Sequence, residues 1–255
     1  MYPVLFQFGG FQIRSYGLIV AVSFVLALWV STREAERKGV DPKLVQDFSL
    51  YAILGGIVGA RLYFVLFSAP DYFLKHPWEI FAVWSGGIGI IGSLLGGFLV
   101  AVWFCHRKRI SLLKFGDTLA PGVALGQTVG QFACLLNGDS YGRPTDLPWA
   151  ITYTDPRSLA PLNIPLHPIE IYEMAAYFLV FVAVWSLKTK FKSDGAAFLT
   201  YLAGYGMARF AVEFFRGEPA IFAWGLPAAQ VFGAAMAVSS LGGFLWLGRI
   251  QKTRI

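Results

Sequence analysis

An arginine and a glutamate lie four residues apart inside a long apolar run, at Arg209 and Glu213. Side chains at this spacing lie on one face of an α-helix, where they can form an ion pair. A charge at the centre of a membrane-spanning helix costs about 2.5–3.5 kcal/mol on insertion scales, so such residues are candidates for function. Arg61 is a further arginine within an apolar run. The simpler alternative is an internal ion pair that only holds helices together.

The most unusual polar stretch of the chain lies between Asn137 and Glu173, and it begins Asn-Gly-Asp-Ser-Tyr-Gly-Arg. Its glycines and prolines are typical of turns. Asp139 is a candidate acid or base here, and the guanidinium of Arg143 can bind an anion through two parallel hydrogen bonds. Long loops are often functional. A solvated loop would contain the same residue types, so this pattern alone favours neither interpretation.

The elements that must position these residues are predicted to be membrane helices. Hydrophobic residues make up 56% of the 255 residues and charged residues only 14%, against roughly 45–50% and about 25% in soluble domains. A bilayer core needs about 20 helical residues. The apolar runs that approach or exceed this length are Tyr16–Ser31, Phe48–Phe67, Trp84–Cys105, Asp117–Leu136, Tyr172–Leu187, Ala196–Phe215 and Trp224–Gly248. We therefore expect an all-α membrane protein, a seven-transmembrane helical bundle that forms a single polytopic membrane domain over residues 1–255.

The orientation follows from lysine and arginine, which are enriched in short cytoplasmic loops. Fourteen of them lie in the loops after the first, third and fifth runs and in the C-terminal tail, whereas five lie in the other polar segments. This distribution predicts an N-terminus outside, a C-terminus in the cytoplasm, and a long outer-side loop between spans four and five.

The same distribution makes the net charge of +6 a topology signal. A nucleic-acid-binding surface would instead concentrate its basic residues in one region, so no nucleic-acid partner is expected. The three histidines are far apart and lack the spacing of metal ligands, so neither a metal site nor a cofactor is expected.

Four arginines should lie towards the outer side of the membrane. They are Arg61, Arg143, Arg209 and Arg216. Arginine suits phosphate because its planar fork makes two hydrogen bonds at once, and phospholipid head groups are the abundant anions at that depth. We therefore expect an anionic lipid ligand. The alternative is that the four arginines only pair with nearby carboxylates, namely Asp139, Glu173, Glu213 and Glu218.

Six stretches follow one another along nearly the whole chain. They are Arg14-Ser-Tyr-Gly17, Gly59-Ala-Arg-Leu-Tyr63, Trp84-Ser-Gly-Gly87, Asn137-Gly-Asp-Ser-Tyr-Gly-Arg-Pro-Thr145, His167-Pro-Ile-Glu-Ile-Tyr-Glu173 and Gly204-Tyr-Gly-Met-Ala-Arg-Phe-Ala-Val-Glu-Phe-Phe-Arg216. In this order they resemble the phosphatidylglycerol–prolipoprotein diacylglyceryl transferase family, and the last stretch is the most specific.

The resemblance implies a transferase of the bacterial inner (plasma) membrane. The family moves the diacylglyceryl group of phosphatidylglycerol onto the lipobox cysteine thiol of prolipoproteins, which is the first step of lipoprotein maturation. Phosphatidylglycerol, the signal peptides of prolipoproteins and membrane lipid are thus the expected partners. The implied catalytic residues are Tyr16, Asp139, Arg209 and Glu213, where Asp139 stands at a position usually held by glutamate. The implied phosphatidylglycerol-binding residues are Arg61, Asn137, Gly142, Arg143 and Arg209.

The chain departs from the family at three positions. The signature arginine is replaced by Gln131 and its asparagine by Cys134, and a histidine frequent in the family is replaced by Ile91. If that histidine is the base for the thiol, another residue must serve, and Asp139 and Glu213 are the candidates. Two interpretations therefore stay open. The chain is an active transferase of a divergent branch, or it is a non-catalytic or altered-substrate homologue that binds phospholipid or lipoprotein precursors.

Overall fold

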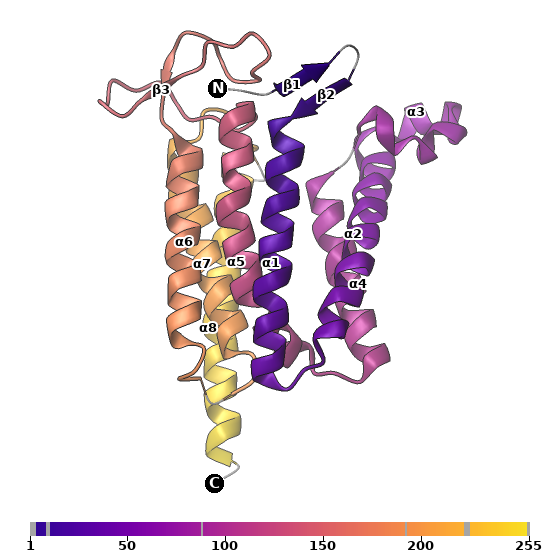
Figure 1. Ribbon diagram of the computed structural model, residues 1–255, viewed down its shortest axis with the longest axis vertical. Helices are drawn as coiled ribbons and strands as arrows, with labels where there is room; N and C mark the ends of the chain where they lie inside the picture. Colours follow the sequence, from indigo (N-terminus) through magenta and orange to yellow (C-terminus); the bar gives the residue numbers. More distant parts are fainter. Residues whose placement is uncertain (1–3, 9–10, 88, 192, 222–224, 254–255) are drawn as a thin grey trace. The chain divides into compact units, whose positions relative to one another are not determined.

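The chain is mostly helical in the computed structural model, which describes residues 4–8, 11–87, 89–191, 193–221 and 225–253 (Figure 1). Each of the seven predicted apolar runs overlaps one long helix. These helices are α1 (Ser15–Lys38), α2 (Pro42–Tyr63), α4 (Ile90–Lys108), α5 (Leu112–Asn137), α6 (Ile169–Leu187), α7 (Ala196–Val212) and α8 (Ala228–Thr253). Trp224, at which the seventh run was predicted to begin, lies outside the described residues.

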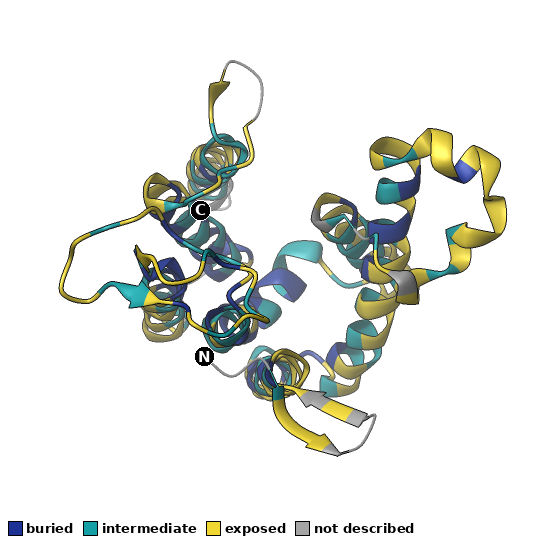
Figure 2. Cartoon of the chain, turned by 90° about the horizontal axis from the view of Figure 1, so that it is seen from above, coloured by how far each residue is buried: buried dark blue, intermediate teal, exposed yellow. Residues whose placement is uncertain are grey.

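Five segments are long and apolar enough to cross a membrane: Ser15–Lys38, Pro42–Ser68, Leu112–Asn137, Ile169–Leu187 and Ala228–Arg249. The prediction of a helical membrane protein is thereby confirmed, whereas the count of seven spans stays a prediction. Much of the helical surface is exposed (Figure 2). The exposed residues include many large apolar ones, such as Leu99 and Leu179. Exposed apolar surface on this scale is rare in soluble monomers and suits helices surrounded by lipid.

The third helix begins later than predicted. We expected it from Trp84, but α4 begins at Ile90, because Gly86 and Gly87 adopt positive φ angles of 85° and 68° that end the preceding turn. Short strands are a further feature that the apolar pattern does not predict. The strands β1 (Val4–Phe8) and β2 (Phe11–Arg14) form one antiparallel pair, and β3 (Ile151–Thr152) and β4 (Pro165–Leu166) form another.

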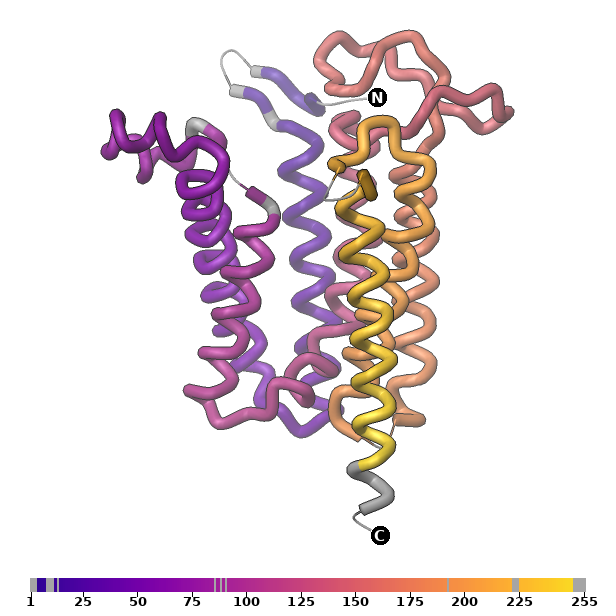
Figure 3. The backbone as a smooth tube through the Cα atoms, turned by 180° about the vertical axis from the view of Figure 1, so that it is seen from behind, coloured from indigo at the N-terminus to yellow at the C-terminus, as the bar shows by residue number. Residues whose placement is uncertain are grey.

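The chain divides into two compact units, residues Met1–Ser31 with Gly116–Ile255, and residues Thr32–Phe115. In the first unit α7 packs against both α6 and α8 (Figures 1 and 3). The backbones of α7 and α8 touch at two glycines, because a Cβ at Gly206 would lie 2.5 Å from the carbonyl oxygen of Gly233. The β3–β4 loop lies at one end of this unit, and the last turns of α8 lie at the opposite end (Figure 1).

A buried aspartate on α5 fixes the start of α7. The carboxylate of Asp117 accepts hydrogen bonds from the backbone N–H groups of Gly195 and Phe198, both at 2.8 Å. Hydrogen bonds to a charged group contribute about 1.5–3 kcal/mol each, and they satisfy N–H groups that a helix leaves unpaired at its N-terminus. Since α7 carries Arg209, this cap contributes to holding the candidate site in place.

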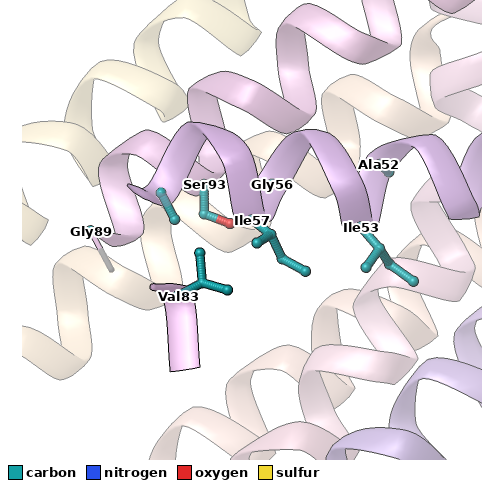
Figure 4. Close-up of a pocket in the computed structure, with 8 residues that line it drawn as sticks. Ala52, Ile53, Gly56, Ile57, Val83, Gly89 and Ser93 are labelled. Carbon is teal, nitrogen blue, oxygen red and sulfur yellow. The ribbon is translucent and has the colours of Figure 1, made fainter. Parts of the chain in front are cut away.

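In the second unit α2 and α4 pack through small residues. A Cβ at Gly59 would lie 2.3 Å from the oxygen of Gly92, and one at Gly96 would lie 2.2 Å from the oxygen of Gly55. Glycines allow such close approach between membrane helices. An apolar pocket of about 540 Å³ lies beside this contact (Figure 4). It is lined by Ala52, Ile53, Gly56, Ile57, Ala60, Val83, Gly89 and Ser93.

The end of α2 turns into a series of short helices. A π-helix, η1 (Phe64–Ser68), continues α2, and the chain then forms α3 (Pro70–Lys75) and the 3-10 helices η2 (Pro77–Phe81) and η3 (Val83–Ser85). Of these short helices, only η3 overlaps the first part of the predicted third span.

Candidate functional site

Two arginines and two glutamates of the first unit form one ion-pair cluster. Arg209 on α7 pairs with Glu173 on α6, and its Nη2 lies 3.5 Å from Oε2 of Glu213. Arg216 lies 3.2 Å from Oε1 of Glu173 through Nη2 and 2.9 Å from Oε2 of Glu213 through Nε. Each carboxylate therefore contacts both guanidinium groups. We call these four side chains the Arg–Glu cluster.

The local fold explains why the cluster forms. After α7 ends at Val212, a 3-10 turn, η4 (Glu213–Phe215), places Glu213 and Arg216 three residues apart on one side of the chain. The side chains of Glu173 and Glu213 are almost fully buried. Buried charges are stable only when they are paired, and one arginine could not balance both carboxylates.

The two positive and two negative charges of the Arg–Glu cluster cancel, so the cluster has no net charge with which to attract an anion. The two arginines are the partly exposed members, at 21% for the side chain of Arg209 and 19% for that of Arg216. Part of each arginine side chain therefore remains accessible, whereas the carboxylates of Glu173 and Glu213 are almost fully buried. The expected pair of Arg209 and Glu213 is present, but Glu173 is a partner that the i, i+4 spacing does not reveal.

Hydroxyl groups complete the surroundings of the two arginines. Arg216 donates from Nη1 to the Ser140 hydroxyl at 3.1 Å, and Arg209 donates to the Tyr177 hydroxyl. The Tyr177 ring stacks on Tyr205 with the ring centroids 5.4 Å apart. Sequence reasoning missed Ser140 and Tyr177. The position of Tyr177, four residues after Glu173 on the same helix, is a signal that could have found it.

Backbone contacts tie the polar loop to the Arg–Glu cluster. The N–H of Arg143 donates to the carbonyl of Phe215 at 2.8 Å, and its Nε donates to the carbonyl of Arg216 at 3.1 Å. Gly142 forms an isolated β-bridge with Arg216, and a Cβ on Gly142 would lie 2.4 Å from the carbonyl oxygen of His167. Only glycine fits this approach. The structure thus brings Gly142 and Arg143 to the cluster as groups that support Arg216.

A second group of predicted residues meets where α5 ends. Asn137 is the last residue of α5, and Gly138 follows with a positive φ of 70° that reverses the chain. The carboxylate of the exposed Asp139 is then hydrogen-bonded with the thiol of Cys134. The phenol of Tyr16 on α1 interacts electrostatically with both groups. Tyr16 and Asp139 therefore lie beside a thiol, at the position where the family signature has asparagine.

Two buried oxygens near these groups have no hydrogen-bond partner among the described residues, Oε1 of Gln131 and Oε2 of Glu170. The other oxygen of Glu170 accepts a 2.8 Å hydrogen bond from the Tyr153 hydroxyl. Burial and the Glu170 carboxylate raise the pKa of the Tyr153 hydroxyl far above its usual range, so it stays a donor. Sequence reasoning missed this pair. At position 131 the chain thus has an uncharged amide, with an acceptor oxygen, where the family signature has a cationic arginine.

Arg61 lies in the second unit and has protein partners of its own. It is 5% exposed, and its guanidinium donates to the carbonyl oxygens of Glu79, Ile80, Gly86 and Gly87. These contacts use four of its five N–H groups. Only one N–H group of Arg61 therefore remains for the predicted contact with a lipid phosphate. Ile91, which replaces the family's histidine, is also in this unit.

Among the described residues, no three or more histidine, cysteine, aspartate and glutamate side chains are grouped so that they could hold a metal ion. The side chains gathered at the candidate site carry guanidinium groups, carboxylates, hydroxyls and one thiol.

Comparison with known proteins gives a consistent result. A model of the prolipoprotein diacylglyceryl transferase family matches residues 3–246. A phosphatidylglycerol–prolipoprotein diacylglyceryl transferase of Bordetella parapertussis is 33% identical over 255 residues, covering 97% of this chain and 95% of that protein. The protein of that name from Trichormus variabilis is 34% identical, with 96% and 89% covered. The one from Methylibium petroleiphilum is 34% identical, with 97% and 96% covered.

Proposed function

The chain belongs to the prolipoprotein diacylglyceryl transferase family, and from this membership we propose that it transfers the diacylglyceryl group of phosphatidylglycerol to a prolipoprotein. The observation that carries the proposal is the match itself, which extends over almost the full length of this chain and of its relatives. The thiol acceptor is the cysteine of a lipobox in the signal peptide of the precursor.

The reaction exchanges one bond on the lipid's glycerol carbon. The thiolate sulfur attacks the carbon that carries the phosphodiester oxygen, a carbon–sulfur bond forms, and the carbon–oxygen bond breaks. Glycerol phosphate leaves with the electron pair. The partly exposed side chains of Arg209 and Arg216 suit this step, because fixed donors near the developing negative charge stabilise a transition state. Arg143 and Gly142 support Arg216 from the loop, and Asn137 ends the helix beside them.

The thiol proton needs an acceptor, and Asp139 fits this role better than Glu213. Glu213 is buried, and its carboxylate is already engaged in ion pairs with two guanidinium groups. Asp139 is exposed and already contacts a thiol, that of Cys134. We infer that Asp139 takes the proton of the substrate thiol and that Tyr16 orients this carboxylate.

A second function stays open for a specific reason. Gln131 supplies an uncharged acceptor in place of the signature arginine, and the Arg–Glu cluster has no excess positive charge. A homologue that only binds phospholipid or precursor would tolerate both features. Turnover separates the two functions, since a binding protein forms no product.

Purified protein should form a thioether-linked diacylglyceryl product from phosphatidylglycerol and a lipobox peptide, as measured by mass spectrometry. We expect phosphatidylglycerol to be used at least about tenfold faster than phosphatidylethanolamine, since roughly 1.4 kcal/mol of difference between the two head groups gives that ratio. A peptide with serine in place of the lipobox cysteine is the matched control and should give no product. Binding of both substrates without product would favour the second function, and equal use of both lipids would contradict the predicted role of the arginines.

We further propose seven spans in the inner membrane with the N-terminus outside. The support is the fourteen-to-five division of lysine and arginine. Cysteines at Leu159 in the long loop and at Lys190 after α6 test it, because both positions are exposed and α6 lies between them. In intact cells a membrane-impermeant maleimide should label Leu159→Cys and should label Lys190→Cys only after the cells are opened. The reverse pattern would show the opposite orientation.

A further inference from the structure

A short segment of the second unit exposes large apolar side chains. We call Pro70–Trp84 the interface segment. It contains α3, η2 and the start of η3, and its most exposed apolar residues are Leu74 (81%), Trp78 (86%), Phe81 (71%) and Trp84 (83%). Trp78 and Phe81 are three residues apart in a 3-10 helix, where side chains at this spacing share one face. Two tryptophans with such exposure indicate a surface that something other than water covers.

The polar residues of the interface segment form a group of their own. The Tyr72 hydroxyl donates to Oε2 of Glu79 at 2.7 Å, and the Tyr72 ring stacks on His76 with the centroids 4.7 Å apart. The segment is therefore amphipathic, with linked polar side chains and a separate set of exposed apolar ones.

Arg61 joins this segment to the end of α2. Its guanidinium donates to the carbonyls of Glu79 and Ile80 within the segment and to those of Gly86 and Gly87 just after it. The carbon of the guanidinium lies 5.0 Å from the centre of the buried Phe73 ring. These contacts close the turn that returns the chain towards α4. One arginine thus contacts Phe73 near the start of this series of short helices and the backbone carbonyls near its end.

The position of the segment along the chain indicates what covers its apolar face. It begins directly after Pro42–Ser68, a helix long and apolar enough to cross a membrane. Tryptophan and tyrosine concentrate at the boundary between lipid tails and water, and amphipathic helices lie in that plane with the apolar face in the acyl region. We propose that the interface segment lies flat in the head-group region of the bilayer, and that Arg61 is the internal anchor that holds it there.

This inference is independent of the transferase reaction, and it gives Arg61 a different role from the predicted phosphate contact. An arginine that holds four carbonyls can be replaced neither by lysine, which has three donors and no planar fork, nor by an apolar residue. Arg61 should therefore be needed for the placement of the segment whether or not lipid phosphate ever reaches it.

Spin labels on single cysteines measure the depth of the segment in vesicles of phosphatidylglycerol and phosphatidylethanolamine. In a background where Cys105 and Cys134 are alanine, labels at Leu74→Cys and Trp78→Cys should collide more with oxygen, which concentrates in lipid, than with a water-soluble nickel chelate. A label at His76→Cys, within the polar group, is the matched control and should show the opposite preference. Equal access of nickel to all three positions would overturn the proposal, as would labels at Leu74 and Trp78 that neither reagent reaches.

The anchor is tested in the same vesicles with the label at Trp78. Arg61→Lys and Arg61→Met should increase the mobility of this label and its access to nickel, because the four carbonyls lose their common donor. The neighbouring Leu62→Ala, which removes a half-exposed side chain of α2, should leave both unchanged. An unaltered label in the arginine variants would show that Arg61 is not the anchor. If those variants do not fold, the depth of the labels in the protein with Arg61 intact still decides whether the segment lies in the interface.

Discussion

Arg209→Met should lower the rate of diacylglyceryl transfer at least about 100-fold. Removing one preorganised donor from a site of developing negative charge typically reduces kcat by about 10²–10³, and the partly exposed Arg209 is proposed to contact the phosphate. Arg209→Lys should recover only part of the loss, because lysine cannot make the two-pronged contact. The measurement is the rate of product formation from phosphatidylglycerol and a lipobox peptide, together with thermal stability.

The single variant alone does not separate catalysis from folding. Removing Arg209 leaves Glu173 buried with one cation fewer, and breaking a buried pair costs about 3–5 kcal/mol. The matched control is Arg209→Met with Glu173→Leu, which removes one charge of each sign and leaves Arg216 paired with Glu213 at 2.9 Å. This double variant should recover most of the lost stability and remain inactive. A double variant that is stable and fully active would reduce Arg209 to a scaffolding residue.

Of the two carboxylate partners of Arg209, the sequence predicts one and not the other. The spacing of Arg209 and Glu213 predicts their pairing from helix geometry alone, and the structure contains this contact at 3.5 Å. The pair with Glu173 joins residues 36 positions apart, so it depends on how α6 packs against α7. Local spacing carries no information about that packing, although the need to balance every buried charge indicates that Glu173 must have a partner.

The helices were more predictable than their ends. A run of apolar residues long enough to cross a bilayer has few other structures available, since lipid leaves no partner for unpaired backbone groups. The predicted start of the third helix was wrong because a pair of adjacent glycines is compatible with a close helix contact and with a turn. Gly86 and Gly87 form the turn, whereas Gly55 and Gly96 form a close contact. The positive φ angles that distinguish the two cases belong to the tertiary structure.

The candidate site was partly predictable for a similar reason. The predicted residues Tyr16, Asp139, Arg209 and Glu213 all lie in the first unit, as do Asn137, Gly142 and Arg143, whereas Arg61 lies in the second. Residue types revealed which side chains could do chemistry, but not their partners, which lie on other helices and in the loop. Tyr153 and Glu170 are 17 residues apart and meet only because the loop folds back on the start of α6. Whether the two units form the predicted single domain stays a prediction.

Asp139→Asn should reduce transfer at least about 100-fold at neutral pH, because a positioned general base contributes roughly 10²–10⁴ to a rate. The size of this loss should depend on pH. A free thiol has a pKa of about 8.5, so above that pH the substrate thiolate forms without a base. The transfer rates of Asp139→Asn and of the unmodified protein should therefore become more similar as the pH rises. Asp139→Glu, which introduces the family's usual residue, should retain activity.

Cys134→Asn is the matched control for this experiment. It removes the thiol that contacts Asp139 and introduces the amide of the family signature, while the proposed base stays in place. This variant should remain active, with the same pH profile as the unmodified protein. Rates would be compared between pH 6.5 and 9.5 on phosphatidylglycerol and a lipobox peptide. If Asp139→Asn is impaired equally at every pH, its carboxylate holds the site together but does not accept the proton. If it is not impaired at all, the base is another residue, and the thiolate must form without help from Asp139.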